Sequence, residues 1–99
     1  MQGRLRAAPG RGRELAALVL EGAGPGLAGC LLYVVGCLAD DPDTVVVTEV
    51  WTDQPAHDAS LLHERVRTAI ARAMPLLAGP PEGVSFDVLG GVGLGLGRP

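Results

Sequence analysis

The chain has 99 residues, 47% of them hydrophobic, which is enough for one domain with a modest core and too few for a second domain. Its net charge of −3 argues against nucleic acid as the main partner. The longest apolar stretch, residues 27–39, is too short to cross a bilayer and lies too far from the N-terminus to be a signal peptide. We therefore expect a cytoplasmic protein that binds neither nucleic acid nor membrane.

The first part of the chain predicts a strand, a helix and a second strand. Residues 2–7 read as a short strand, and residues 11–21 as a helix that places Leu15 and Leu18 on one face. After a glycine-rich connection, residues 30–38 form a strand that is apolar on both sides. A strand of this kind needs cover on both faces of its sheet.

The middle of the chain predicts a hairpin followed by a helix. The Asp-Asp-Pro-Asp run at residues 40–43 is a strong turn signal, so we expect a long loop that leads into a third strand over residues 44–52. Asp53 is a plausible helix N-cap and Pro55 suits the first helical turn. The pattern predicts a short helix from there to about Leu62.

The last part of the chain predicts another helix, which follows the short one, and then a final strand. The helix carries Val66, Ile70, Ala73 and Leu77 at helical spacing and bends or ends near Pro75. Residues 84–89 then read as a strand, and residues 90–99 as a glycine-rich tail. We regard residues 1–99 as a single domain with this C-terminal tail.

The order of the elements, β-α-β-β-α-β, indicates an α+β fold, a ferredoxin-like sandwich with helices on one face of an antiparallel sheet. The strands carry apolar side chains on both faces, while the helices cover only one. The other face therefore needs a partner, and a second copy of the chain would supply it. We expect a homodimer.

Residues 48–60 combine a strand end with a helix start and carry most of the chain's chemically useful side chains. On a strand, Glu49 and Trp51 point to the same face, and His57 follows just after the helix begins. Together with the Pro-Asp pair at residues 42–43 and the Pro-Leu-Leu run at residues 75–77, this segment resembles the antibiotic biosynthesis monooxygenase family. Within that family, the chain most resembles the small quinol monooxygenases. The resemblance extends from about Arg4 to Leu94.

The resemblance implies a dimeric α+β barrel and a monooxygenase that uses neither metal nor flavin. Such an enzyme deprotonates an electron-rich aromatic substrate, a quinol or an anthrone, and the anion reduces dioxygen. Many members carry a His near position 60, where this chain has Ser60. Several branches, among them the haem-degrading relatives, rely on a pocket Asn, and this chain contains no Asn, so haem degradation is not expected.

Glu49, His57 and His63 are the candidate catalytic residues. A carboxylate that is partly desolvated beside Trp51 could take a proton from a phenol, or it could pair with Arg or His and brace the sheet against a helix. A neutral imidazole at His57 could act as a base near neutral pH, and both His residues could equally be capping or surface groups.

Trp51 and Tyr33 are the candidate substrate-binding residues. Trp51 could form the wall of an aromatic pocket or pack in the core. Tyr33 could donate a hydrogen bond to a quinone oxygen or fill the core with its hydroxyl at the rim. For both side chains, the sequence is compatible with substrate contact and with core packing.

The remaining motifs exclude several kinds of site. The two His are six residues apart with no Cys at a metal-binding interval, so we expect no metal site. The resemblance implies that no other cofactor is needed either. Cys30 and Cys37 are seven apart on one predicted strand, which excludes a disulfide, and we expect both to be buried thiols. A non-catalytic dimeric protein that binds a small ligand, and a polyketide isomerase or cyclase of the same fold, are the alternatives to a monooxygenase.

Overall fold

The structure is a computed structural model that describes residues 1–22 and 27–93. A four-stranded sheet has the order β2-β3-β1-β4, with every neighbouring pair antiparallel. Its strands are β1 (Gln2–Arg6), β2 (Cys30–Leu38), β3 (Asp41–Trp51) and β4 (Glu82–Val84). Its helices are α1 (Gly12–Gly22), α2 (Gln54–Ser60), α3 (Glu64–Ala73) and the short 3-10 turn η1 (Met74–Leu76).

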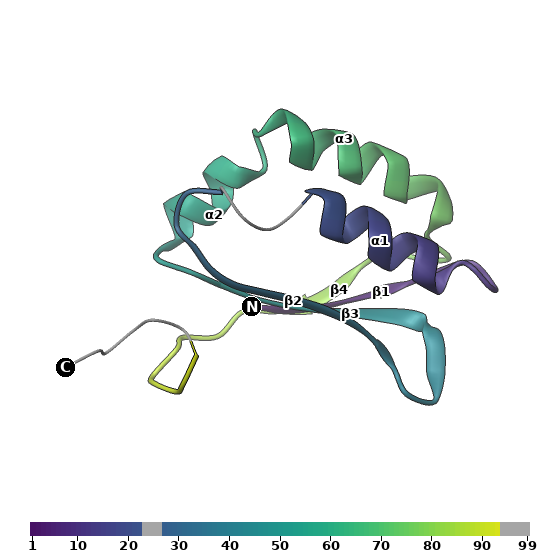
Figure 1. The fold of residues 1–99 in the computed structure, drawn as a ribbon, viewed down its shortest axis with the longest axis horizontal. Coiled ribbons are helices and arrows are strands. Elements are labelled where there is room, and N and C mark those ends of the chain that lie inside the picture. Colours follow the sequence, from purple (N-terminus) through teal and green to yellow (C-terminus); the bar gives the residue numbers. More distant parts are fainter. Residues whose placement is uncertain (23–26, 94–99) are drawn as a thin grey trace.

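All the helices lie on one face of the sheet, as Figure 1 shows, and this is the expected ferredoxin-like α+β arrangement. The core lies between α1 and the two central strands. Its buried members are Ala7, Leu15, Leu18, Val45, Val47 and Leu76. The predicted apolar face of α1 is therefore confirmed. Within the described residues, no helix is long and apolar enough to cross a bilayer.

The start of α1 is fixed by the strand beside it. The Asp43 carboxylate accepts hydrogen bonds from the backbone N–H groups of Gly10 and Gly12, at 3.0 and 3.1 Å. A carboxylate at a helix N-terminus satisfies N–H groups that have no partner inside the helix. A Cβ added at Gly12 would overlap the Pro42 carbonyl oxygen, so the helix can approach β3 only through a glycine.

The β2–β3 hairpin differs from the expected long loop. Only Ala39 and Asp40 separate the two strands, because β3 begins at Asp41, three residues earlier than predicted. Pro42 is tolerated inside β3 because the pairing register shifts between Cys37 and Leu38. Cys37 is exposed near this turn, so the expectation that both thiols are buried is wrong for Cys37, whereas Cys30 is partly buried.

The last strand is much shorter than predicted. β4 pairs with β1 in a register that sets Gln2 opposite Val84. Beyond Val84 the chain has therefore passed the start of β1 and has no neighbouring strand to pair with. Residues 85–89 were expected to continue the strand and do not; Figure 1 shows this segment leaving the sheet next to the N-terminus. Residues 94–99 of the predicted tail lie outside the described residues.

The buried face of α3 differs from the predicted one at Ile70, whereas Val66, Ala73 and Leu77 are partly buried as expected. Ala69 is buried and Ile70 is exposed. A Cβ on Gly22 would come within 2.5 Å of the Ala69 Cβ, which shows how closely α1 and α3 approach each other. Small residues allow such an approach, so Ala69 faces α1 and the larger Ile70 points outward.

Candidate functional site

Glu49 and Trp51 lie two residues apart on β3, on the face that the helices cover. The Trp51 indole N–H donates a hydrogen bond to Glu49 Oε1 at 2.8 Å. A hydrogen bond to the charged form of a carboxylate stabilises that form. The Glu49 side chain is only 12% exposed, so this bond lies in a partly desolvated setting.

α2 brings His57 to the same carboxylate. The Asp53 side chain caps the helix by accepting from the Ala56 N–H at 2.8 Å, and Pro55 fits the first turn, as predicted. This start places His57 Nε2 3.3 Å from Glu49 Oε1. The His57 and Trp51 rings meet edge to face, with centroids 5.5 Å apart and planes at 82°.

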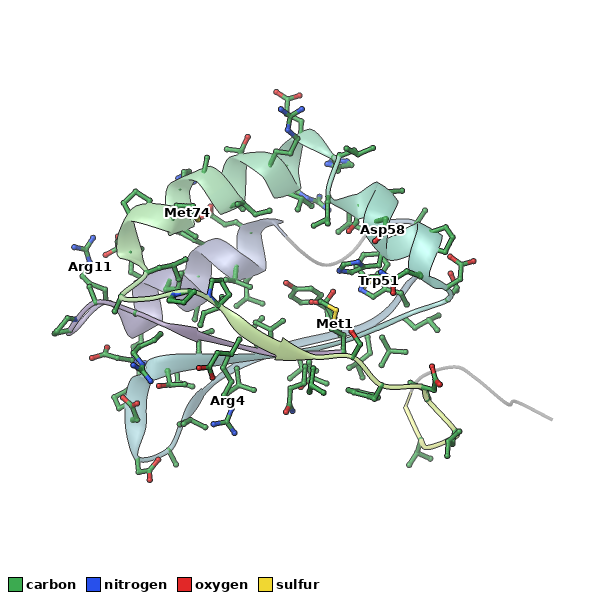
Figure 2. The ribbon with its side chains drawn as sticks, turned by 180° about the vertical axis from the view of Figure 1, so that it is seen from behind. Met1, Arg4, Arg11, Trp51, Asp58 and Met74 are labelled. Atoms are coloured by element: carbon green, nitrogen blue, oxygen red, sulfur yellow. The ribbon has the colours of Figure 1, made fainter. Side chains whose placement is uncertain are left out.

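A second carboxylate lies on the other side of the His57 ring. His57 Nδ1 is 3.4 Å from Asp58 Oδ1, and the Gln54 side-chain amide donates to the same oxygen at 2.9 Å. These contacts, the Gln54 hydrogen bond first, lower the pKa of Asp58. The His57 side chain is 14% exposed and that of Asp58 is 63% exposed. The His57 ring therefore lies between the largely buried Glu49 carboxylate and the exposed Asp58 carboxylate. Figure 2 shows Trp51 between α2 and the sheet, with Asp58 on the helix beside it.

Glu49, Trp51 and His57 line one cavity of about 390 Å³. Its other walls come from the first residue of the chain, the start of β2, the β3–α2 junction and the segment after β4. These are Met1, Leu31, Val50, Thr52, Asp53, Gln54, Ser85, Phe86, Asp87 and Val88. A volume of this size, with an aromatic wall and a few placed polar groups, is typical of small-ligand sites.

Tyr33 stands next to this cluster without lining the cavity. It pairs with Glu49 across the β2–β3 ladder and packs against the core. Burial, and then the Glu49 charge, raise the pKa of Tyr33, so the phenol keeps its proton. The structure therefore supports the packing interpretation of Tyr33 more directly than substrate contact.

His63 is separated from the cluster. It caps α3, where its Nδ1 accepts from the Arg65 N–H at 3.1 Å. It lines a different, more open hollow of about 420 Å³, whose wall includes the ion pair of Arg72 and Glu21 at 2.9 Å. This hollow is slightly larger, but it contains no aromatic ring besides His63 and lies apart from Glu49 and Trp51. In the part of the chain that the structure describes, no group of three His, Cys, Asp or Glu side chains could hold a metal ion.

The sequence profile of the family described as "Antibiotic biosynthesis monooxygenase" matches residues 1–72. These residues contain every element from β1 to α3 except the last residue of α3, and they include Glu49, Trp51 and His57. The part of the cavity wall that follows β4 lies outside the match. The chain belongs to the antibiotic biosynthesis monooxygenase family. The resemblance inferred from residues 48–60 is thereby confirmed.

Solved structures of the antibiotic biosynthesis monooxygenase family have the same fold. A "putative Antibiotic biosynthesis monooxygenase" from Chloroflexus aurantiacus J-10-fl is 38% identical, with a TM-score of 0.76 over 90% of this chain and 95% of its own. A "Putative antibiotic biosynthesis monooxygenase" from Nitrosomonas europaea is 16% identical, with a TM-score of 0.82 over 89% of this chain and 95% of its own, and shows the fold alone. No curated protein sequence gives a significant match.

Ser60 stands where the resemblance led us to expect a His. Ser60 is one helical turn after His57, and its hydroxyl donates to the His57 carbonyl oxygen at 2.5 Å. Positions three apart share one face of a helix, so His57 brings an imidazole to the face on which Ser60 lies. Asp58 and Gln54 were not singled out from the sequence, although their four-residue spacing on a predicted helix is a recognisable pair.

Proposed function

We propose that this protein is a cofactor-independent monooxygenase that acts on a quinol-like or anthrone-like aromatic substrate with dioxygen. One observation carries the proposal: a carboxylate, an indole and an imidazole, contributed by Glu49, Trp51 and His57, converge on one wall of a cavity large enough for a small aromatic molecule. Membership of the antibiotic biosynthesis monooxygenase family supports the reaction class.

Glu49 is the proposed base. Both Trp51 and His57 contact its Oε1, which leaves Oε2 to accept a proton from a substrate hydroxyl. A general base must lie within hydrogen-bonding reach of the proton it removes, and a side chain that lines the cavity meets this condition. The resulting anion gives electrons to dioxygen. One oxygen atom enters the substrate and the other leaves as water, with all the electrons coming from the substrate.

Trp51 is the proposed aromatic wall. Its ring lines the cavity while its N–H holds the Glu49 carboxylate in place. A substrate ring that packs against the indole would therefore be oriented with its hydroxyl near Glu49. Orientation of this kind accounts for a large part of catalysis where no cofactor takes part.

The test is oxygen uptake by metal-free protein with reduced menadione or an anthrone, corrected for autoxidation. Uptake should be unaffected by a chelator, and Glu49→Gln should lower it by about 100-fold or more, since general bases contribute at least that much. Trp51→Ala should also lose activity. Leu20→Ala, at an exposed position on α1, is the matched control and should behave as wild type.

Uptake that equals autoxidation with both substrates, or uptake that survives Glu49→Gln, would contradict the proposal. Substrate conversion without oxygen consumption would favour the isomerase or cyclase alternative, because such an enzyme uses the same base. Retained ligand binding without any conversion would favour a non-catalytic binding protein.

A further inference from the structure

His57 lies between two carboxylates that come from different elements. Its Nε2 is 3.3 Å from Glu49 Oε1 on β3, and its Nδ1 is 3.4 Å from Asp58 Oδ1 on α2. A neutral imidazole donates from only one nitrogen, so one of these contacts would then join two acceptors. A ring that carries a proton on both nitrogens donates to both carboxylates. The two carboxylates are therefore placed to stabilise the ring once Nε2 has taken up a proton.

The two carboxylates are placed for different tasks. Glu49 is largely buried, lines the cavity and accepts from the Trp51 N–H. Asp58 is mostly exposed, is held by the Gln54 amide, and is not among the residues that line the cavity. Glu49 is therefore the group that can meet a substrate, while Asp58 can act only through the His57 ring.

We infer that Asp58 is a positioning residue that stabilises the protonated ring of His57, so that His57 can take over the proton that Glu49 removes from the substrate. This inference rests on the proposed function. The substrate O–H bond breaks, its electron pair stays on the oxygen, and the proton binds Glu49 Oε2. Rotation of the resulting carboxylic acid turns this O–H toward the ring, and the proton passes to His57 Nε2, which leaves Glu49 a carboxylate. Nδ1–H remains hydrogen-bonded to Asp58. After the product leaves, Nε2 releases the proton to water and can accept another one.

Other charged groups around the cavity do not contact the ring directly. Within residues 1–22 and 27–93, the ion-pair contacts of His57 are those with Glu49 and Asp58. Asp53 caps α2, the Met1 amino group donates to the Glu49 carbonyl oxygen at 2.9 Å, and Asp87 lies on the segment after β4. Tyr33, opposite Glu49, keeps its proton. A change at Asp58 alone therefore isolates its effect on the ring.

The experiment follows the ¹⁵N shifts of the His57 ring by NMR across pH in labelled full-length protein without substrate. His63→Gln removes the only other His signal and so assigns the spectrum. Asp58→Asn should lower the pH at which His57 loses its second proton by about half a pH unit, a modest shift because Asp58 is exposed. Asp40→Asn, which removes an exposed carboxylate at the β2–β3 turn, should leave that pH unchanged.

An unchanged titration of His57 in Asp58→Asn, or an equal shift in Asp40→Asn, would overturn the role of Asp58. Oxygen uptake by the same proteins tests the catalytic part separately. The pH profile of kcat should move with the NMR titration. If the titration moves and wild type consumes no oxygen, the proposed function and this catalytic role both fail. If oxygen is consumed while the titration stays fixed, only the role of Asp58 fails.

Discussion

Trp51 contributes two different surfaces to the cluster, and this explains why a single Trp matters here. Its N–H fixes Glu49, and its ring meets His57 edge to face. A Phe at this position would retain an apolar wall but could not hold the carboxylate. The sequence placed Glu49 and Trp51 on one face by the strand period, and this much follows from two residues alone.

Tyr33 provides a residue-scale prediction about pH. Its pKa is raised, mainly by burial and further by the Glu49 charge, relative to an ordinary value of about 10. The unfolded chain therefore ionises this phenol at a lower pH than the folded chain does. The stability that Tyr33 contributes is fully present below about pH 10 and is lost as pH rises from there through the folded-state value.

We expect Tyr33→Phe to lessen the fall in stability above pH 10. Urea unfolding of the two proteins at pH 8 and at pH 10.5 measures it. The chain has no Lys side chain to titrate in this range, and the Met1 amino group and the Cys30 and Cys37 thiols are common to both proteins. An equal loss of stability in wild type and variant would show that ionisation of Tyr33 does not cause the fall in stability above pH 10.

His57 and His63 show how far local sequence patterns can predict the position of a side chain in the fold. The helix start at Asp53 predicted that His57 would lie near the end of β3, which it does. His63 is only six residues later but starts a different helix and faces another hollow. The bend between α2 and α3 decides this, and its direction depends on packing against α1, which no local pattern encodes.

At the scale of elements, the contact of α1 with β3 depends on Gly12. A Cβ there would overlap the Pro42 carbonyl oxygen, which is backbone and cannot swing aside. We expect Gly12→Ala to lower the free energy of unfolding by about 3 kcal/mol, the upper end for overpacking. Urea denaturation measures the loss. Gly79→Ala is the matched control, because a Cβ at Gly79 has nothing within 4 Å. Similar small effects in both variants would show that α1 can shift without cost.

The elements that the sequence predicted well are those with long, regular patterns. β2 has the predicted bounds, and α1 differs by one residue at each end. The errors fall where tertiary pairing decides. Pro42 argued for a loop, but the register shift beside it allows β3 to continue. Residues 85–89 look like a strand locally, yet they lie beyond the first residue of β1 and have no strand to pair with. Strand length is set by the partner as much as by the strand's own residues.

At the scale of the whole molecule, one face of the sheet has no helices over it (Figure 1). Val34 is 55% exposed on β2, and Val84 is 59% exposed on β4 at the opposite edge. After β4, Leu89 and Val92 are also exposed. Between these edges, β1 places the exposed side chains of Gln2, Arg4 and Arg6 on the same face. Exposed apolar side chains bordered by polar ones on an uncovered sheet face are typical of an interaction surface. We therefore propose that a second copy of the chain covers this face and forms a homodimer.

The dimer can be tested by sedimentation velocity at micromolar concentration. Wild type should sediment as a dimer, and Val34→Glu should sediment as a monomer, because a carboxylate buried in place of an apolar side chain at an interface is costly. Leu20→Glu, at a similarly exposed position on α1, should remain dimeric. Val34 is half exposed within one subunit, so the variant should keep its far-ultraviolet circular dichroism. A wild-type monomer, or dissociation by both variants alike, would place the interface somewhere other than the open face of the sheet.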